Sequence, residues 1–217
     1  MGFSSGTSLS EAWSQYNRQF STAEYAIKVC EHLSAELSES AVISLSTSGE
    51  YAVAALRQQS EDSASAIKSL EKAYDLTRKA TKEVLCQGLL LLADRVGSIR
   101  IKYGEDTHDL LAKHIENFNE HEGDLSRLTG LIKDIEEGKA TKKRNFIEQS
   151  QEIIRRIVNF MDEYTIKAEV INADYGQMKK NRWAHTWGKL IAAIAGLAVA
   201  YLLDVVVNLI ILSMCSR

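Results

Sequence analysis

The sequence predicts an all-α protein: an elongated bundle of about four long heptad-patterned helices, the last of which continues into a C-terminal transmembrane helix. Three observations support this fold class. The 217 residues contain no proline, which permits very long uninterrupted helices. Apolar residues recur in alternating steps of four and three along most of the chain. Finally, the 27 residues between Lys189 and Arg217 carry a single charge, Asp204.

The first predicted helix begins at Ser8, after a flexible tail formed by residues 1–7. Ser8 and Glu11 have the spacing of a capping box, in which each side chain bonds the backbone N–H of the other residue. A heptad stripe, which predicts a long helix with a partner along its length, then follows at Leu9, Trp13, Tyr16, Phe20, Ala23, Ile27, Cys30, Ser34, Leu37 and Ala41. The serine-rich residues 44–50 predict the first break, because serines compete with the backbone and Gly49 disfavours a helix.

The second predicted helix covers about residues 50–102 and has a looser stripe diluted by serine and threonine. Its positions are Val53, Leu56, Ser63, Ile67, Leu70, Tyr74, Thr77, Val84 and Leu91. From residue 84 to residue 99 apolar residues occupy nearly every face of the helix. This segment is too short to span a bilayer, so the pattern predicts burial among several helices. Gly104 and Asp106 predict the next turn.

The third predicted helix covers about residues 107–137 and closes at Gly138, with a stripe at Leu111, Ile115, Phe118, Leu125, Leu128, Ile132 and Ile135. The fourth opens near Thr141 with the same rhythm at Ile147, Ser150, Ile154, Ile157, Met161, Tyr164, Ala168, Ile171, Tyr175 and Met178. Long helices with short connections pack as antiparallel neighbours. Residues 8–188 therefore predict a cytosolic helical bundle or coiled-coil rod.

Residues 189–214 predict a transmembrane helix, followed by a short tail at 215–217. An apolar helix of this length extends about 40 Å, enough to cross a hydrocarbon core of roughly 30 Å. The preceding cations and tryptophans are typical of a membrane interface: Lys179, Lys180, Arg182, Trp183, Trp187 and Lys189. The excess of basic residues on the N-terminal flank predicts a single-pass tail anchor with the bundle in the cytosol, at an intracellular membrane. The alternatives are a buried helix of a soluble protein, or a hairpin folded at Asp204, where neither Gly nor Pro would make the turn.

Asp204 belongs to a row of small and polar residues spaced every four positions: Ala192, Gly196, Ala200, Asp204 and Asn208. Small residues at this spacing let two membrane helices approach closely, and Asp204 and Asn208 could then hydrogen-bond across the contact. The row therefore predicts self-association, pairing with another membrane helix, or the lining of a pore. The simpler alternative is a membrane anchor without a partner helix, in which protonated Asp204 pairs with Asn208 of the same helix.

A second group of basic residues, at Lys139, Lys142, Lys143 and Arg144, would contact anionic lipid if the bundle lay on the membrane. A solvated helix start is the alternative interpretation. The net charge of −3 disfavours nucleic acid as a partner. The expected partners are a lipid bilayer and either further copies of this chain or another helical protein.

The sequence predicts no enzyme activity, no cofactor, no metal site and no small-molecule substrate. The cysteines Cys30, Cys86 and Cys215 are widely separated in the sequence, whereas cysteine pairs that bind a metal or act in redox chemistry are closely spaced. His114 and His121 share a helix face about 10 Å apart, beyond the reach of one ion, and His108 is offset from both. No glycine-rich phosphate loop, zinc-protease motif or nucleophile elbow occurs.

The layout resembles that of three classes of membrane protein. A heptad helix that leads into a C-terminal anchor after three other helices resembles the syntaxin type of SNARE. The likeness is limited to layout, since Met161 and Tyr164 occupy the central positions where those proteins carry Gln or Arg. Residues 23–37, AEYAIKVCEHLSAEL, resemble the first helix of F-BAR domains. The bundle with its apolar segment is similar to pore-forming toxins of the cytolysin A type.

The function predicted first is a tail-anchored scaffold or tether that oligomerises through its helical rod and the small and polar row of its membrane helix. The second is an α-helical pore or channel in which Asp204 and Asn208 face water. The third, implied by the resemblances, is SNARE-like or BAR-like membrane remodelling. Permeability of a membrane containing the protein separates the first two.

Overall fold

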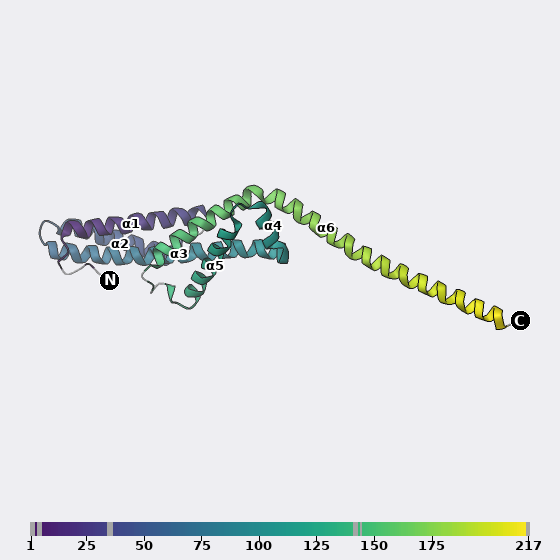
Figure 1. Cartoon of the computed structure of the whole chain (residues 1–217). Coiled ribbons are helices and arrows are strands. Elements are labelled where there is room, and N and C mark those ends of the chain that lie inside the picture. Colours follow the sequence, from purple (N-terminus) through teal and green to yellow (C-terminus); the bar gives the residue numbers. More distant parts are fainter. Residues whose placement is uncertain (1–2, 4–5, 34–36, 141–142, 144, 216–217) are drawn as a thin grey trace. The chain divides into compact units, whose positions relative to one another are not determined.

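The computed structural model describes residue 3, residues 6–33, 37–140, 143 and 145–215, with side chains described as far as Ala195 (Figure 1). The described residues form helices and no strand, which confirms the all-α class and the helical bundle. Contacts divide the chain into two compact units, Met1–Ile166 and Lys167–Arg217. The predicted boundary at residues 188 and 189 rests on hydropathy, which is a different criterion, and stays a prediction.

The longest helix of the first unit, α3, is its central element. One pair of helices lies along its N-terminal half, α1 parallel and α2 antiparallel to it (Figure 1). Another pair lies along its C-terminal half, the first part of α6 parallel and α5 antiparallel to it. In chain order the elements are α1 (Leu9–His32), α2 (Glu39–Gln58), α3 (Ser63–Tyr103), the short 3-10 helix η1 (Gly104–Asp106), α4 (Thr107–His114), α5 (Phe118–Glu136) and α6 (Phe146–Cys215).

Helix α1 begins as predicted. The Ser8 hydroxyl accepts from the Glu11 N–H at 3.3 Å, and the Glu11 carboxylate accepts from the Ser8 N–H at 2.8 Å. The four-three rhythm is present, but the buried stripe is rotated from the predicted one and reads Ala12, Tyr16, Gln19, Ala23, Ala26 and Cys30. Small alanines bring α1 close to α3, so the larger Phe20 is left at the rim, 37% exposed.

The predicted break at residues 44–50 is wrong, because this segment lies inside α2. The breaks occur on either side of it, after His32 and after Gln58. Ser44 and Ser48 face α3, and the Ser48 hydroxyl lies 2.8 Å from the carbonyl oxygen of Ala73 and 2.6 Å from the Thr77 hydroxyl. A buried serine with partners on the neighbouring helix does not disrupt its own backbone. Of the predicted first-helix stripe, Leu37 falls in the connection, Ala41 in α2, and Ser34 outside the described residues.

Side-chain caps define the true ends. The Ser38 hydroxyl accepts from the Ala41 N–H at 3.1 Å and starts α2. The Asp62 carboxylate accepts from the N–H groups of Ala64 and Ser65, at 3.0 and 3.3 Å, and starts α3. Both residue types are strong N-caps, but the predicted helices ran through Ser38 and Asp62, because their apolar stripes continue past these residues.

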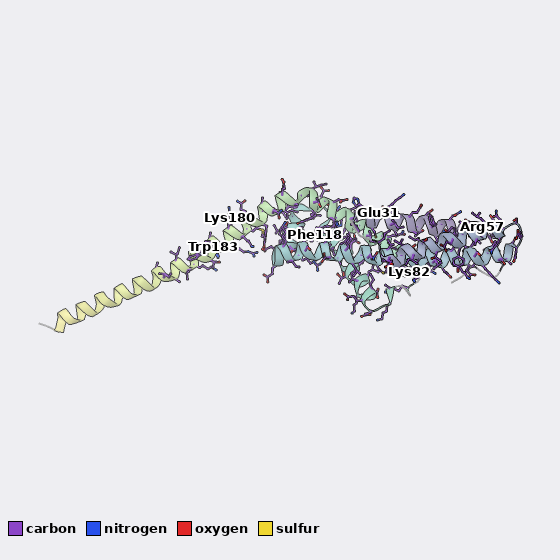
Figure 2. All side chains as sticks on the ribbon, turned by 180° about the vertical axis from the view of Figure 1, so that it is seen from behind. Glu31, Arg57, Lys82, Phe118, Lys180 and Trp183 are labelled. Carbon is purple, nitrogen blue, oxygen red and sulfur yellow. The ribbon has the colours of Figure 1, made fainter. Side chains whose placement is uncertain are left out.

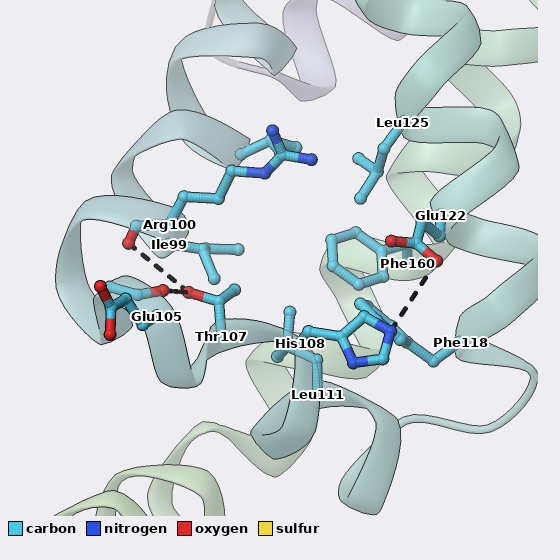
Figure 3. Close-up of a pocket in the computed structure, with 12 residues that line it drawn as sticks. Ile99, Arg100, Glu105, Thr107, His108, Leu111, Phe118, Glu122, Leu125 and Phe160 are labelled. Carbon is cyan, nitrogen blue, oxygen red and sulfur yellow. Dashed lines mark hydrogen bonds and ion pairs between the residues drawn. The ribbon is translucent and has the colours of Figure 1, made fainter.

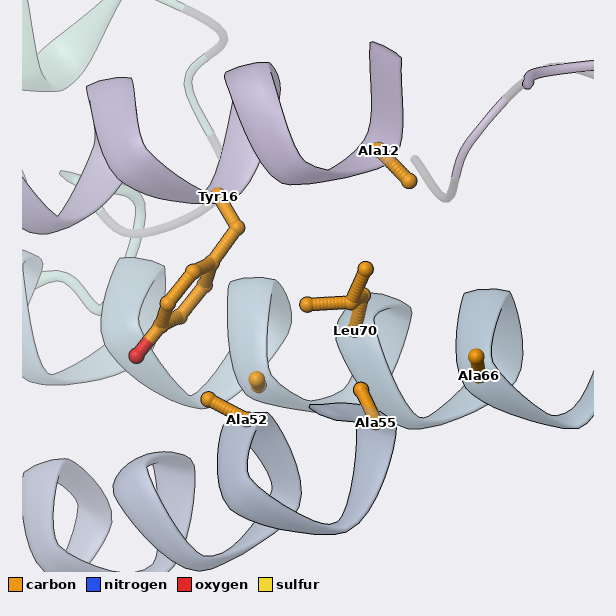
Figure 4. Packing of buried hydrophobic residues seen from close by; sticks show 7 residues of the cluster. Ala12, Tyr16, Ala52, Ala55, Ala66 and Leu70 are labelled. Atoms are coloured by element: carbon orange, nitrogen blue, oxygen red, sulfur yellow. The ribbon is translucent and has the colours of Figure 1, made fainter. Parts of the chain in front are cut away.

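The core shared by α1, α2 and the N-terminal half of α3 is built mainly from alanines (Figure 4). Its buried members are Ala12, Tyr16, Ala52, Ala55, Ala66, Leu70 and Ala73. Short side chains allow close approach of helices, and Tyr16 and Leu70 fill the space that remains. Val53 and Leu56, predicted on the buried stripe, are instead 47% and 52% exposed on α2.

The predicted burial of residues 84–99 on nearly every face of the helix is confirmed for one broad face of α3 only, since Leu90 is 44% exposed and Asp94 and Ser98 are exposed as well. The buried positions in this segment are Val84, Leu85, Gly88, Leu89, Leu92, Val96 and Ile99. At Gly88 an added Cβ would lie 2.9 Å from the Sγ of Cys30 in α1 and 3.6 Å from Cδ1 of Ile154 in α6. Helices α1, α3 and α6 therefore pack closely at Gly88, where α3 has no side chain.

The continuous helix predicted over residues 107–137 is wrong. The chain forms η1 and α4, and then a break in which Asn117 takes a left-handed conformation with φ 54°. Asparagine tolerates this conformation better than most residues. The break turns both Ile115 and Phe118 inward, and the Glu116 N–H donates to the Glu163 carboxylate of α6 at 2.8 Å.

Helix α6 continues without interruption from Phe146 to Cys215, in agreement with the predicted continuation of the fourth helix. The predicted start, Thr141, lies outside the described residues. Within the part of the chain that the structure describes, no helix combines the length and the apolar character needed to cross a membrane. Of the predicted row, Ala192 is exposed, and the side chains of Gly196, Ala200, Asp204 and Asn208 lie outside that part.

Candidate functional site

Aromatic rings and cations are concentrated on α6 within the second unit, just before the apolar segment. The rings of Trp183 and Trp187 contact each other, with centroids 5.3 Å apart and planes inclined by 58°. They are 68% and 45% exposed. The two rings meet because one helical turn separates them, and no other described element covers them. Figure 2 shows Lys180 and Trp183 on this part of α6.

The cations of this region are exposed as well. Lys179 lies with its Nζ 4.9 Å from the centroid of the Tyr175 ring, a cation–π contact. Lys180, Arg182 and Lys189 are exposed along the same stretch. We name residues 175–189 the basic aromatic band. Amphipathic rings next to lysine and arginine combine an apolar body with a polar or charged tip, which suits a boundary between water and lipid.

The band is followed directly by exposed apolar side chains. Leu190, Ile191 and Ile194 are 49%, 62% and 59% exposed. Positions three and four residues apart share one side of a helix, so these three side chains form one exposed apolar face.

The second predicted lipid contact is partly neutralised within the protein. Lys139 Nζ lies 2.5 Å from Glu137 Oε2, and Lys143 pairs with the Asp134 carboxylate. Lys142 and Arg144 lie outside the described residues. Two of the four charges are therefore offset by neighbouring carboxylates, and the contact with anionic lipid stays a prediction.

The first unit contains a cavity of about 270 Å³ near the C-terminal end of α3 (Figure 3). Half of its twelve lining residues are apolar: Val96, Ile99, Leu111, Phe118, Leu125 and Phe160. The polar side chains of Arg100, Glu105, His108 and Glu122 also line it. The cavity exists because the break at Asn117 folds α4 away from α5. Helices α4, α5 and α3 then enclose a space that a single straight helix in place of α4 and α5 would have filled.

The imidazole of His108 lines this cavity. Its Nε2 lies 3.8 Å from Oε2 of Glu122 and its Nδ1 lies 3.4 Å from Oδ1 of Asp109, while its ring stacks edge-on against Phe118 at 5.6 Å. The nearby Thr107 hydroxyl donates to the Gly104 carbonyl oxygen at 2.7 Å rather than to the histidine. The arrangement can hold a small apolar group, but the histidine is not paired with a hydroxyl that it could activate.

A buried carboxylate joins α5 to α6. Asp124 is 4% exposed, and its two oxygens lie 3.7 Å from Arg127 Nη1 and 3.6 Å from Arg156 Nη1. Arg156 also bonds Glu152 at 3.0 Å. This group connects the helices electrostatically, and both arginines reach solvent. Among the described residues, no group of three or more histidine, cysteine or acidic side chains is placed to hold a metal ion.

Sequence reasoning missed the cavity, because its residues come from five separate elements and no motif unites them. It also missed the exposed apolar face of α2, although a signal was present: Val42, Ser46, Gly49, Val53 and Leu56 follow the four-three rhythm. Placing a break at residues 44–50 divided that stripe.

Comparison with known proteins gives no further indication of family. No family model, no curated protein and no solved structure matches the chain.

Proposed function

We propose that this protein is a tail-anchored membrane scaffold or tether, with a helical bundle in the cytosol and residues 189–214 in an intracellular membrane. The observation that carries the proposal is the stretch of 27 residues from Leu190 to Ser216 in which Asp204 is the single charged residue. An apolar stretch of 18 or more residues is a transmembrane candidate, and a helix of this length reaches about 40 Å.

Two further features support the anchor. The helical backbone of α6 continues through this stretch to Cys215, so its peptide groups bond one another, as lipid requires. The basic aromatic band precedes it, where a helix would enter the headgroup region. Its cations favour the cytosolic side, which puts the bundle there.

The row from Ala192 to Asn208 supports oligomerisation within the membrane. An aspartate at the bilayer centre costs about 2.5–3.5 kcal/mol on the insertion scale, and a second helix that hydrogen-bonds with its carboxyl group offsets that cost. A pore in which Asp204 and Asn208 face water is the second candidate, favoured by the same row. Pairing of the cytosolic bundles, in coiled-coil fashion or otherwise, would add to the association.

The test is insertion and permeability of the full chain in liposomes. We expect the protein to resist extraction at alkaline pH and a C-terminal tag to be protected from protease, while the bundle is digested. A variant with Ile194→Arg and Leu202→Arg should be extracted, because each cation in the apolar segment opposes insertion by a few kcal/mol. Ile166→Arg, at a position that is 82% exposed in the first unit, is the matched control and should remain bound.

Permeability decides between the two candidates. The tether predicts intact liposomes that retain potassium and small dyes, and Asp204→Leu should then lower the oligomer order without changing insertion. A leak of small ions that Asp204→Leu abolishes would establish the pore instead. Release of the unmodified protein at alkaline pH would contradict both.

A further inference from the structure

The outer face of α2 carries large apolar side chains that no described part of the fold covers. Val42, Ile43, Val53 and Leu56 are 49%, 56%, 47% and 52% exposed. The opposite face of the same helix is buried against α3 through Ala41, Ser44, Ser48, Ala52 and Ala55. Helix α2 is therefore apolar on the side that faces solvent and small on the side that faces the core, the reverse of the usual distribution.

The outer face is organised as one continuous stripe of apolar and small residues. Val42, Ser46, Gly49, Val53 and Leu56 are separated by four, three, four and three residues, the spacing that keeps side chains on one helix face in a two-helix contact. The middle of the stripe is open, because a Cβ added to Gly49 would meet no atom within 4 Å. Large apolar side chains at both ends and small residues between them are suited to a helix–helix interface.

Other exposed apolar residues of the first unit lack this pattern. On α1, Phe20 and Tyr25 are 37% and 44% exposed, but Arg18, Glu24 and Lys28 stand among them. Helix α2 has three charged residues in its 20: Glu39, Glu50 and Arg57. Helix α2 thus carries fewer charged residues beside its exposed apolar side chains than α1 does.

The charges of α2 specify the partner and its direction. Glu39 begins the helix and Arg57 lies in its last turn, and both are exposed. A second α2 packed in the same direction would bring Glu39 to Glu39 and Arg57 to Arg57. One packed in the opposite direction brings each Glu39 to the Arg57 of the other copy, and this contact occurs twice by symmetry.

We propose that the outer face of α2 binds a second copy of this chain in antiparallel orientation. The two-fold axis passes near residues 47 and 48, so Val42 of one copy packs against Val53 of the other and Ser46 packs against Gly49. The small size of both Ser46 and Gly49 lets the helices approach closely there. Glu50 of each copy then faces the hydroxyl of Ser46 rather than the other Glu50.

This orientation has a consequence for a membrane tether. Helix α2 lies along the N-terminal half of α3, while α6 leaves the first unit near the C-terminal end of α3, where the hydroxyls of Tyr103 and Tyr164 are 3.0 Å apart. Antiparallel pairing puts the two points of departure at opposite ends of the paired units. The pairing thus suits copies anchored in two apposed membranes. This last step rests on the proposed function, whereas the pairing itself does not.

Disulfide cross-linking of the full chain in detergent tests the orientation. In a Cys86→Ser, Cys215→Ser background, chains with Val42→Cys and chains with Val53→Cys carry tags of different size and are mixed before mild oxidation. We expect the mixed 42–53 product to form at least tenfold faster than the 42–42 product. A dominant 42–42 product would indicate parallel pairing and overturn the proposal, as would the absence of any cross-link.

Charge exchange and apolar substitution test the contacts. Glu39→Arg and Arg57→Glu should each raise the dimer Kd, and the double variant should restore it, because the exchanged charges again meet opposite partners. Val53→Lys, opposite Val42 of the other copy, should raise the Kd about tenfold or more. Ile101→Lys, at an 85% exposed position of α3, is the matched control and should leave the Kd unchanged. An equal effect of Ile101→Lys and Val53→Lys would overturn the assignment of the surface.

Clustering of liposomes that carry the full chain, followed by light scattering, distinguishes the pairing of two chains from the bridging of two membranes. Clustering that Val53→Lys abolishes supports bridging of two membranes. Cross-linked dimers without clustering would overturn the bridging and leave the pairing in place. Dimers formed by a chain that is released at alkaline pH would support the pairing while contradicting the membrane anchor.

Discussion

Gly88 of α3 lies directly against Cys30 of α1, so that a methyl group added at Gly88 would come within 2.9 Å of the cysteine Sγ. The thiol is itself held in place, with its Sγ 3.2 Å from the carbonyl oxygen of Val84. Ile154 of α6 closes the third side. At this point the two pairs of helices that flank α3 meet, and the packing leaves room for a hydrogen atom only.

Gly88→Ala should therefore destabilise the bundle even though alanine favours helices. We expect the free energy of unfolding to fall by about 1–3 kcal/mol, the usual cost of overpacking. The measurement is urea unfolding of the full chain in detergent, followed by circular dichroism. Gly97→Ala is the control on the same helix, where the added Cβ meets no atom within 4 Å, and it should stabilise by about 0.5–1 kcal/mol. Adding Cys30→Ala to Gly88→Ala should recover stability; failure to recover any would show that the strain lies elsewhere.

Asp124→Asn should weaken the attachment of α5 to α6. The carboxylate is buried between Arg127 and Arg156, both of which reach solvent, so we expect a loss of about 1–3 kcal/mol rather than the full cost of breaking a buried pair. Asp109→Asn makes the same chemical change at a side chain that is 83% exposed, and should alter stability by less than about 0.5 kcal/mol. If both variants unfold at the same urea concentration, Asp124 makes no net contribution to the junction.

Cys30 should make stability depend on pH in the alkaline range. Burial raises the pKa of its thiol to about 11 from the usual 9.0. The unfolded chain therefore loses the thiol proton first, so the contribution of this group is fully present below pH 9 and is lost as the pH rises from about 9 to about 11. The loss should be about 2–3 kcal/mol. The Cys30→Ala variant has no thiol proton to release at this position. Its unfolding free energy should therefore fall less between pH 9 and pH 11 than that of the unmodified protein, and the difference should equal the contribution of the thiol. Parallel pH profiles would contradict the burial of the thiol.

Trp183 and Trp187 should report insertion of α6 at the membrane interface. In a Trp13→Phe background, emission should shift to shorter wavelength when the chain is reconstituted into liposomes, because the rings leave water. Lipids brominated near the headgroups should quench it more strongly than lipids brominated at the chain ends. Trp183→Ala with Trp187→Ala should weaken membrane association without altering the helical content of the bundle. Equal quenching at both depths would be inconsistent with an interfacial position.

Local chemistry in the sequence was sufficient for the general class of fold and for the cap at Ser8, whereas the predicted helices ran through Ser38 and Asp62. Ser8, Ser38 and Asp62 cap the helices that follow them, since side-chain oxygens of this kind satisfy free N–H groups within three residues. The stripe of the fourth helix could be predicted for a similar reason, whereas the burial of residues 84–99 holds for one face only. An apolar rhythm depends on one helix, and it needs no knowledge of the partner.

Errors arose where a distant residue decided the outcome. Ser44 and Ser48 predict a break by propensity, but hydrogen bonds to Thr77 and to the Ala73 backbone hold Ser48 inside a helix. The turn at Asn117 interrupts a regular apolar rhythm, because both Ile115 and Phe118 gain burial from it. Neither contact can be read from spacing along the chain.

The sequence by itself determined that the chain is helical, where α1 and α4 begin, and that its last segment is apolar enough to raise the question of a membrane, since these properties depend on neighbours within a few residues. Only the tertiary structure decided that α3 is the common element of two helix pairs and that α2 turns Val53 and Leu56 to solvent. The physical reason is that burial of one helix face depends on the volume and hydrogen bonds offered by the helix across from it. A heptad stripe identifies a face suited to contact, and the packing of α1, α2 and α3 decides which face the fold itself uses and which it leaves for a partner.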